Sequence, residues 1–407
     1  MIYNGFMITT KKYVITIVVL VLLCGATFGL GLNMGAKGYV YQGHNFQIIN
    51  QNNAPKNVDY NLLWQALDIL NQNYIDKPVD QQKILYGAVQ GAIAAVGDPY
   101  TEFFDPTAYK DFETSLSGSF EGIGAEVTLN NGAVQIVSTL DGSPAKQAGL
   151  LAGDYILKID GQDATKMTLD EAVNKIRGPK GTQVHLTILR GSQQKDITIT
   201  RNTINVASVK YSTINKNGKT FEDINILEFG DDTVNLFAQA ATDAQSKHVS
   251  GIILDLRDDP GGYLDDAVKI ASYWVNKGDV VVSEAHSDGT TQTYTALGNN
   301  VLHDIPTVVL INGGTASAAE ILSGALRDHG FAKLIGEKSF GKGSVQQLFN
   351  LPDNTAMKVT IAKWLTPNGQ NLNHNGLDPD IKVALTAENI KNNQDPQMDA
   401  AVAQLLK

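Results

Sequence analysis

Ser317 is the residue of this sequence best placed for nucleophilic chemistry. The apolar run Thr307–Ile311 predicts a buried strand, which ends at the turn Asn312–Gly314 and continues at once as an alanine-rich helix. Ser317 therefore falls at the first turn of that helix, beside backbone N–H groups without acceptors and the positive end of the helix dipole. A nucleophile and a developing oxyanion can share such donors. Most serines at helix starts only cap the helix, so the turn alone leaves both interpretations open.

A catalytic serine needs a base, and Lys342 is the strongest candidate. Gly341 and Gly343 flank it and allow a close approach of the backbone. If this segment is extended, Lys342, Ser344 and Gln346 share one face, and Gln346 could orient the amine as a neutral acceptor. Burial would lower the pKa of the amine toward neutrality. The ordinary alternative is a solvated loop lysine.

Histidine is the usual base for a serine, but most histidines of this chain are badly placed. His329 ends the helix that the serine begins, about 18 Å away at 1.5 Å per residue. His303 and His248 lie at the opposite ends of their strands. His286 and His374 fall in expected loops, so a Ser-His-Asp triad through one of them stays open.

A second strand with a glycine-rich turn precedes the serine in the chain. The continuous apolar run Gly251–Leu256 predicts a central parallel strand, and it is followed by the turn Arg257–Gly262 and a helix. Two such units predict an α/β core with both turns at the same edge of the sheet. The charges of Asp258 and Asp259 would disfavour an oxyanion there unless both side chains point away.

The region between about 117 and 203 changes to strands and turns and resembles a PDZ domain. The resemblance rests on Gly122-Ile123-Gly124-Ala125, on the glycine-spaced segment Ser143–Asp154 and on Ile159–Gly161. A predicted helix begins with the capping box of Thr168 and Glu171. In such a domain the N–H groups of Gly122, Ile123, Gly124 and Ala125 would bind a terminal carboxylate, while the neighbouring edge strand pairs with the peptide. The alternative is a small β domain whose glycines only make turns.

Four motifs together resemble the carboxyl-terminal processing, or tail-specific, proteases. They are TASAAEIL at 315–322, GEKSFGKGSVQ at 336–346, LDLRDDPGG at 254–262 and GDPYT at 97–101. The resemblance covers the chain from about residue 58 to its end and implies a PDZ domain ahead of a crotonase-like α/β Ser–Lys protease core. It further implies relatives that associate through helical N- and C-terminal segments.

The resemblance also implies roles for individual residues. Ser317 matches the nucleophile, Lys342 the general base and Gln346 the residue that orients the lysine. The backbone N–H groups of Ala318 and of the Gly261–Gly262 turn match the oxyanion hole. Glu320 matches a common position of the family, and a first-turn acid favoured by the helix dipole explains it equally well. The sequence departs from many relatives at Ala319, where they carry a second serine, and at Asp258 and Asp259, where they carry asparagine.

The N-terminal part predicts a membrane anchor and a helical domain. Tyr13–Leu32 contains no charged residue, follows Lys11 and Lys12, and is long enough to span a bilayer with the lysines on the cytoplasmic side. A cleaved signal peptide is the alternative, and either one makes the rest extracytoplasmic. The predicted division is a cytoplasmic N-terminus 1–12, an anchor 13–34, a spacer 35–56, a helical domain 57–116, a PDZ domain 117–203, a protease core 204–385 and a C-terminal helical segment 386–407.

Composition narrows the possible partners. The 407 residues carry a net charge of −10 with no lysine- or arginine-rich stretch, which argues against a nucleic-acid surface. A single cysteine and scattered histidines predict neither a disulfide nor a metal site, and no cofactor is expected.

Together with the family resemblance and the charge-free N-terminal run, these features lead us to expect a membrane-anchored serine endopeptidase that acts on polypeptides with free, apolar C-termini, and that can form a homodimer. An inactive PDZ adaptor on the membrane is the competing class.

Overall fold

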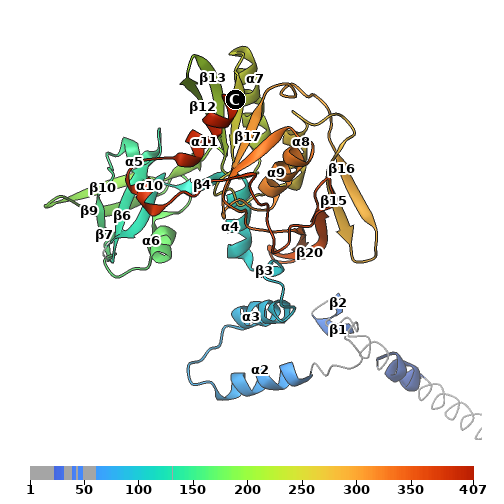
Figure 1. Ribbon diagram of the computed structural model, residues 1–407. Coiled ribbons are helices and arrows are strands. Elements are labelled where there is room, and N and C mark those ends of the chain that lie inside the picture. Colours follow the sequence, from blue (N-terminus) through green and yellow to red (C-terminus); the bar gives the residue numbers. More distant parts are fainter. Residues whose placement is uncertain (1–22, 32–38, 43–44, 49–60, 131) are drawn as a thin grey trace, which may run out of the picture. The chain divides into compact units, whose positions relative to one another are not determined.

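The computed structural model describes residues 23–31, 39–42, 45–48, 61–130 and 132–407, which fall into two compact units, Met1–Ile84 and Leu85–Lys407 (Figure 1). Residues 23–31 of the predicted anchor are helical, and the rest of residues 13–34 lies outside the described ranges. Within those ranges, no helix has both the length and the apolar character needed to cross a bilayer.

The predicted N-terminal helices form, and their apolar side chains stay exposed in the single chain. On the first of them, Leu62 is 72% exposed and Ile69 is 63% exposed. These helices are α2 (Asn61–Asn73) and α3 (Gln81–Ala94), and the hairpin β1 (Tyr39–Gln42) and β2 (Asn45–Ile48) precedes them. Exposed apolar faces of this kind need a partner to be covered.

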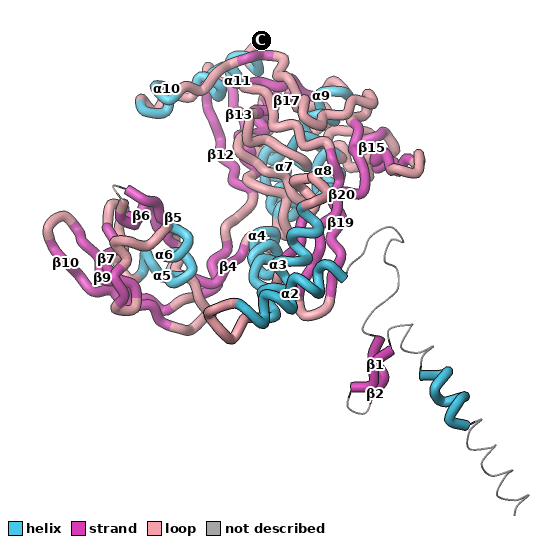
Figure 2. Tube along the Cα trace, turned by 90° about the horizontal axis from the view of Figure 1, so that it is seen from below, coloured by secondary structure: helices cyan, strands magenta, loops and turns pink. Residues whose placement is uncertain are grey.

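The region expected to be a PDZ domain folds as an antiparallel sheet in the order β10-β9-β7-β6-β5, with β8 on β7 and two helices (Figure 2). Strand β5 therefore lies at an edge and begins at Ala125, the last residue of the Gly122–Ala125 segment. The predicted capping box begins α6, where the Glu171 N–H donates to Thr168 and the Thr168 N–H donates to Glu171. The elements are β5 (Ala125–Asn130), β6 (Ala133–Thr139), α5 (Pro144–Gln147), β7 (Tyr155–Ile159), β8 (Gln162–Asp163), α6 (Leu169–Ile176), β9 (Gln183–Arg190) and β10 (Gln193–Thr200).

Four elements at the borders of this domain could be predicted only in part from the sequence. Helix α4 (Pro106–Leu116) begins as predicted, with Asp105 accepting from the first-turn N–H groups. Strand β4 (Ser119–Gly122) pairs antiparallel with β11 (Asn202–Asn205), so the entering and leaving chains of the domain are tied together. Strand β3 (Glu102–Phe104) was not predicted.

The core is a mainly parallel sheet in the order β12-β13-β14-β17-β18-β21. As expected, β14 pairs parallel with both neighbours, so the turns after β14 and β17 lie at the same edge. The strands are β12 (Val209–Lys216), β13 (Lys219–Ile226), β14 (Gly251–Asp255), β17 (Thr307–Ile311), β18 (Ala332–Gly336) and β21 (Ile381–Lys382). The helices are α7 (Thr233–Ser246), α8 (Leu264–Ala271), α9 (Ala318–Asp328), α10 (Ala387–Lys391) and α11 (Pro396–Leu405).

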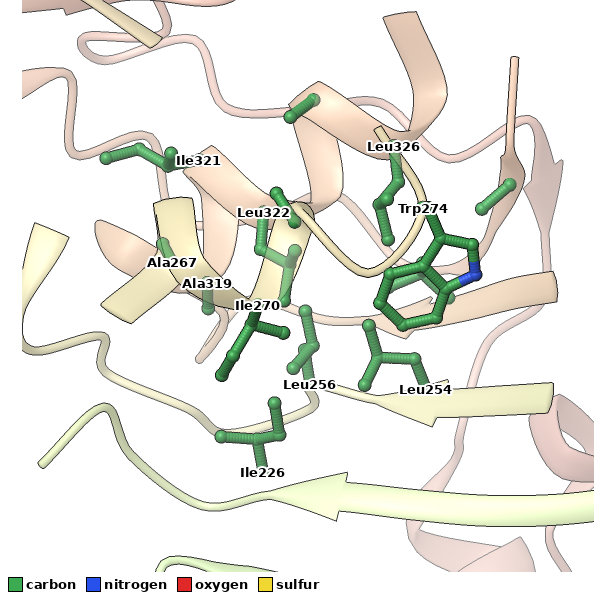
Figure 3. Close-up of a cluster of buried hydrophobic side chains, with 14 of the residues drawn as sticks. Ile226, Leu254, Leu256, Ala267, Ile270, Trp274, Ala319, Ile321, Leu322 and Leu326 are labelled. Carbon is green, nitrogen blue, oxygen red and sulfur yellow. The ribbon is translucent and has the colours of Figure 1, made fainter. Parts of the chain in front are cut away.

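Both faces of this sheet are buried, which is why its strands are continuous apolar runs. On one face, Ala267 and Ile270 of α8 and Leu322 of α9 pack over Leu254 and its neighbours (Figure 3). On the other face, Ile253 contributes to a smaller cluster with side chains of α11. The carboxyl ends of β14 and β17 are thereby held rigidly, and the two glycine-rich turns are held with them.

Helix α11 is also fixed by charge. Arg257, in the turn after β14, forms ion pairs with Asp255 at 2.6 Å and with Asp395, the N-cap of α11, at 2.9 Å. The predicted C-terminal helical segment 386–407 thus contains the two helices α10 and α11.

A second sheet has the order β16-β15-β20-β19, with β3 on β20, and its strand β19 follows the segment that carries Lys342. Strands β19 and β20 form a hairpin, and a bulge interrupts its register between Val345 and Gln346. Figure 2 shows β19 and β20 side by side. Its strands are β15 (Val280–His286), β16 (Thr291–Thr295), β19 (Ser344–Leu351) and β20 (Thr355–Leu365).

Candidate active site

Ser317 is the N-cap of α9 and has an unusual backbone conformation. Its φ of 54° and ψ of −117° lie in a region that residues other than glycine rarely adopt. Gly261, from the other turn, comes so close that a Cβ at that position would lie 2.7 Å from the Ser317 Cβ. Strain of this kind persists only where the surroundings hold it, and it concentrates at functional sites.

Hydrogen bonds between the two turns provide that support. The Thr315 hydroxyl donates to the Leu256 carbonyl at 2.7 Å, and the Ala316 N–H donates to the Asp259 carbonyl at 2.9 Å. The Asp258 N–H donates to the Asn312 side-chain oxygen, and the Asn312 amide donates back to the Asp258 carboxylate, each at 2.9 Å. The predicted convergence of the two turns is therefore present.

The N–H groups predicted to form the oxyanion hole differ in their hydrogen bonding. The Ala318 N–H, at the first turn of α9, has no hydrogen-bond acceptor within the part of the chain that is described. The Gly261 N–H donates to Asp259 Oδ1 at 2.8 Å, and the Gly262 position packs against the Phe229 backbone. The oxyanion roles of Gly261, Gly262 and Ala318 stay predictions, and Asp259 competes for one of these donors.

The two aspartates of this turn differ sharply. Asp258 reaches Asn312, whereas Asp259 is fully buried and its Oδ2 has no partner among the described residues. Burial, with a smaller contribution from the charge of Glu228, raises the pKa of Asp259 well above its usual range, and the Gly261 N–H opposes this only in part.

An Asp259→Asn variant is expected to be more stable than the unsubstituted protein at about pH 8, by about 1–3 kcal/mol. Asparagine keeps the acceptor for Gly261 but cannot ionise. Because the folded-state pKa of Asp259 is raised, its stability contribution is complete below the unfolded pKa and is lost as pH rises through the folded pKa. Urea unfolding at about pH 4 and about pH 8 measures the difference between the two proteins, which should grow with pH. A difference independent of pH would contradict this account.

Lys342 lies in a partly enclosed position between β18 and β19. Its Nζ lies 5.1 Å from the centroid of the Tyr100 ring, and its carbonyl accepts from the Trp364 indole at 2.7 Å. Burial, followed by the charge of Lys358, lowers the pKa of the Lys342 amine, against the opposing carboxylates of Glu102, Glu320 and Asp98. A lowered pKa is what a general base of this type requires.

Gln346 shares a side of the strand with Ser344, as the period of two predicted. Its side-chain Nε2 donates to the Ser344 hydroxyl at 2.9 Å and to the Thr360 hydroxyl at 3.2 Å. Its partners in the structure are therefore these hydroxyls, and the direct hold on the Lys342 amine stays a prediction.

Glu320 connects the two candidate catalytic segments. Its buried carboxylate accepts from the Ser317 N–H at 3.0 Å and from the Lys342 N–H at 2.9 Å. It also accepts from the Ser339 hydroxyl at 2.5 Å and from the Gly341 N–H at 2.8 Å. Burial raises the pKa of Glu320 in spite of these bonds. A carboxylate that only favoured the helix dipole would not need these partners, and the contacts show that Glu320 also ties the start of α9 to the 339–342 segment.

His286 and His374, which the sequence left as possible bases, contact groups other than Ser317. The His286 ring lies 3.7 Å from Glu284. His374 is exposed, and its backbone N–H donates to the Gly341 carbonyl at 2.8 Å. In the described ranges, no hydrogen bond joins either ring to Ser317.

Sequence reasoning missed the environment of the lysine. The motif GDPYT was noted without a role, yet its Tyr100 ring faces Lys342 and its Thr101 hydroxyl accepts from the Thr360 N–H at 3.0 Å. The motif was the available signal, but nothing in the local pattern indicates a contact with a segment so distant in the chain.

Comparison with known families agrees with this architecture. Residues 220–383 match Peptidase family S41, residues 135–190 match a PDZ domain, and residues 20–108 match the N-terminal domain of the activating protease CtpB.

Individual relatives give the same result. A carboxy-terminal-processing protease of Bartonella bacilliformis is 40% identical over 316 residues, which are 76% of this chain and 71% of the relative. A probable CtpA-like serine protease of Staphylococcus haemolyticus is 39% identical over 320 residues, 78% of this chain and 64% of the relative. The chain thus spans about two thirds of the length of these relatives. The solved photosystem II D1 C-terminal processing protease is similar with a TM-score of 0.50 and 29% identity, over 79% of this chain and 91% of that one.

The strand–turn–helix units, the PDZ domain ahead of them and the identity to relatives over about two thirds of their length lead to one conclusion. The chain belongs to peptidase family S41, among the carboxy-terminal-processing serine proteases.

Proposed function

We propose that this protein is a serine endopeptidase that cleaves polypeptides by a Ser317–Lys342 mechanism, with Gln346 orienting the lysine. The observation that carries the proposal is the shared carboxylate of Glu320, which accepts from the N–H groups of both Ser317 and Lys342. One buried carboxylate thus ties the backbone at the proposed nucleophile to the backbone at the proposed base.

The proposed reaction is acyl transfer. The neutral Lys342 amine takes the proton of the Ser317 hydroxyl as Ser317 Oγ attacks the scissile carbonyl carbon. The oxyanion is stabilised by the Ala318 N–H and by the Gly261–Gly262 turn. The tetrahedral intermediate collapses, the ammonium returns the proton to the leaving amine, and an ester on Ser317 remains. Lys342 then activates the water that hydrolyses this ester.

For oxyanion stabilisation by Gly261, its N–H must exchange Asp259 Oδ1 for the substrate oxygen. The distance of 2.8 Å to Asp259 describes the free enzyme. Catalytic hydrogen bonds commonly form only in the complex with substrate. A neutral Asp259 would give up this N–H at a lower electrostatic cost than an ionised one.

Substrate selection is proposed to occur at the PDZ domain, where the Gly122–Ala125 loop would bind a free C-terminal carboxylate. Strand β5 begins at Ala125, the last residue of this loop, and lies at the sheet edge, as strand addition requires. Gly124 has a φ of 73°, and a Cβ there would lie 2.5 Å from the Ser143 Cβ, so the loop depends on glycine at that position. The apolar C-terminus of the substrate and a gating role of the domain belong to this proposal.

Acid quenching of the reaction with a peptide that ends in an apolar residue tests the proposal. Mass mapping should place the N-terminal part of the substrate as an ester on Ser317, and an adduct on another residue would contradict it.

The same peptide with an amidated C-terminus should be cleaved about tenfold or more slowly, because a charge-assisted hydrogen bond at the loop contributes about 1.5–3 kcal/mol. Equal cleavage rates for the free and the amidated peptide would contradict recognition of the C-terminal carboxylate.

The site of action is proposed to be the extracytoplasmic face of the cell membrane, with residues 13–34 as a single-pass anchor. The charge-free run behind Lys11 and Lys12 supports this. A homodimer through the helical terminal segments is proposed from the exposed apolar side chains of α2. Fractionation of the full chain would contradict the anchor if the protein is recovered without detergent, and sedimentation at micromolar concentration would contradict the dimer if it shows only monomers.

A further inference from the structure

The loop between α3 and β3 reaches the candidate base from a distant part of the chain. The Tyr100 ring lies 5.1 Å from Lys342 Nζ and is itself half-buried. The loop is fixed at its end because β3 pairs antiparallel with β20, with Phe104 opposite Ala356. The lysine side chain therefore has an aromatic neighbour that none of the roles assigned above uses.

A chain of hydrogen bonds holds this loop and continues to Gln346. The Asp98 carboxylate accepts from the Thr101 hydroxyl at 2.6 Å and from the Tyr100 N–H at 3.1 Å. The Thr101 oxygen accepts from the Thr360 N–H at 3.0 Å, and the Thr360 hydroxyl accepts from the Gln346 amide at 3.2 Å. The ring facing the lysine and the residue proposed to orient the lysine thus share one support.

The ring acts on the amine in two opposite ways. Its π face attracts an ammonium by about 0.5–2 kcal/mol, which favours the charged form. Its bulk excludes water, and loss of water can lower the pKa of a fully buried lysine by about 3–5 units, at 1.36 kcal/mol per unit. Burial has the largest effect on the pKa of the Lys342 amine and lowers it, and the charge of Lys358 lowers it further. The carboxylates of Glu102, Glu320 and Asp98 oppose this shift. The ring is one of the groups that keep water from the amine, and its removal would therefore expose the amine to solvent.

We propose that Tyr100 is a positioning residue for Lys342. The Tyr100 ring shields the lysine amine from water, and the Asp98–Thr101–Thr360 hydrogen bonds hold the ring and Gln346 in fixed positions relative to each other. This inference rests on the role of Lys342 in the proposed function. It assigns the loop at 97–101 to the environment of the base, so that a segment preceding the PDZ domain completes the catalytic core.

Competitive labelling of lysines measures this effect without relying on catalysis. In a Ser317→Ala background, the full chain is treated with trace acetic anhydride across a pH series, and the labelling of Lys342 is compared with that of exposed Lys338 by mass spectrometry. Tyr100→Ala should raise the titration midpoint of Lys342 by about one pH unit, a tenfold change in the fraction of neutral amine at a given lower pH. Tyr100→Phe, which keeps the ring, should leave the midpoint unchanged.

The titration midpoint of Lys342 also provides the control and the result that would overturn the inference. Tyr109→Ala removes another half-buried tyrosine, whose hydroxyl donates to Asn350 at 3.0 Å, and should leave the Lys342 midpoint in place. If Tyr100→Ala unfolds the protein, Tyr100→Leu takes its place. An unchanged midpoint in the folded variant overturns the inference. Full peptidase activity of Lys342→Met would instead overturn the proposed function, so the two failures are distinguishable.

Discussion

A Ser317→Ala variant is expected to lose peptidase activity almost completely, with kcat reduced by at least about 10⁴-fold. Alanine has no hydroxyl to attack the scissile carbonyl, so no acyl-enzyme forms. The fold should remain, because the bond from the backbone N–H of residue 317 to Glu320 does not depend on the side chain. Steady-state cleavage of a peptide with an apolar C-terminus measures the loss, and circular dichroism checks the fold.

Ser323→Ala is the matched control for this variant. Ser323 lies on the same helix and is fully buried, and its hydroxyl donates only to the Ala319 carbonyl, at 2.7 Å. Its replacement removes the same group from α9 without touching the turn, and activity should persist. Comparable activity in the Ser317→Ala variant would mean that the chain uses another nucleophile.

The second large effect is expected at Lys342. Methionine retains most of the apolar side chain that packs beside Tyr100 but has no amine, so Lys342→Met should lower kcat/KM by about 10²–10⁴-fold, the usual contribution of a general base. In the unsubstituted enzyme the neutral amine increases as pH rises, and its lowered pKa places this rise below the range of an ordinary lysine. The pH profile of kcat/KM should therefore show an ascending limb that the variant lacks.

Lys338→Met serves as the control because this exposed lysine lies on the same loop, with Asp378 at 3.9 Å as its ionic partner. Its activity and pH profile should match those of the unsubstituted enzyme. An ascending limb that survives in Lys342→Met would assign the base to another group.

Patterns within a few residues were sufficient to predict much of this fold. The capping box at Thr168 and Glu171 predicted the start of α6, and the apolar run at Gly251–Leu256 predicted a central parallel strand. The meeting of Ser317 with Gly261 also followed from the sequence, because the carboxyl ends of neighbouring parallel strands share one edge.

What could not be predicted depends on contacts between distant segments. Strand β3 is short, and its partner β20 lies far along the chain, so no local period reveals it. The burial of Asp259 beside an exposed Asp258 is equally invisible, since neighbouring residues of the same type differ only in the direction that the turn gives them. The four hydrogen bonds of Glu320 depend on two loops meeting, whereas the sequence shows only its place in the first turn of α9.

The pairing of β3 with β20 has a consequence for the order in which the protein acquires activity. Contacts between residues far apart in the chain require costly loop closure and generally form late in folding. A chain that has folded its parallel sheet but has not yet docked the 97–104 segment would carry Ser317 with a lysine still open to water. Under the proposed mechanism such a chain would be a poor protease, so the pairing of β3 with β20 would link hydrolytic activity to the completion of the fold.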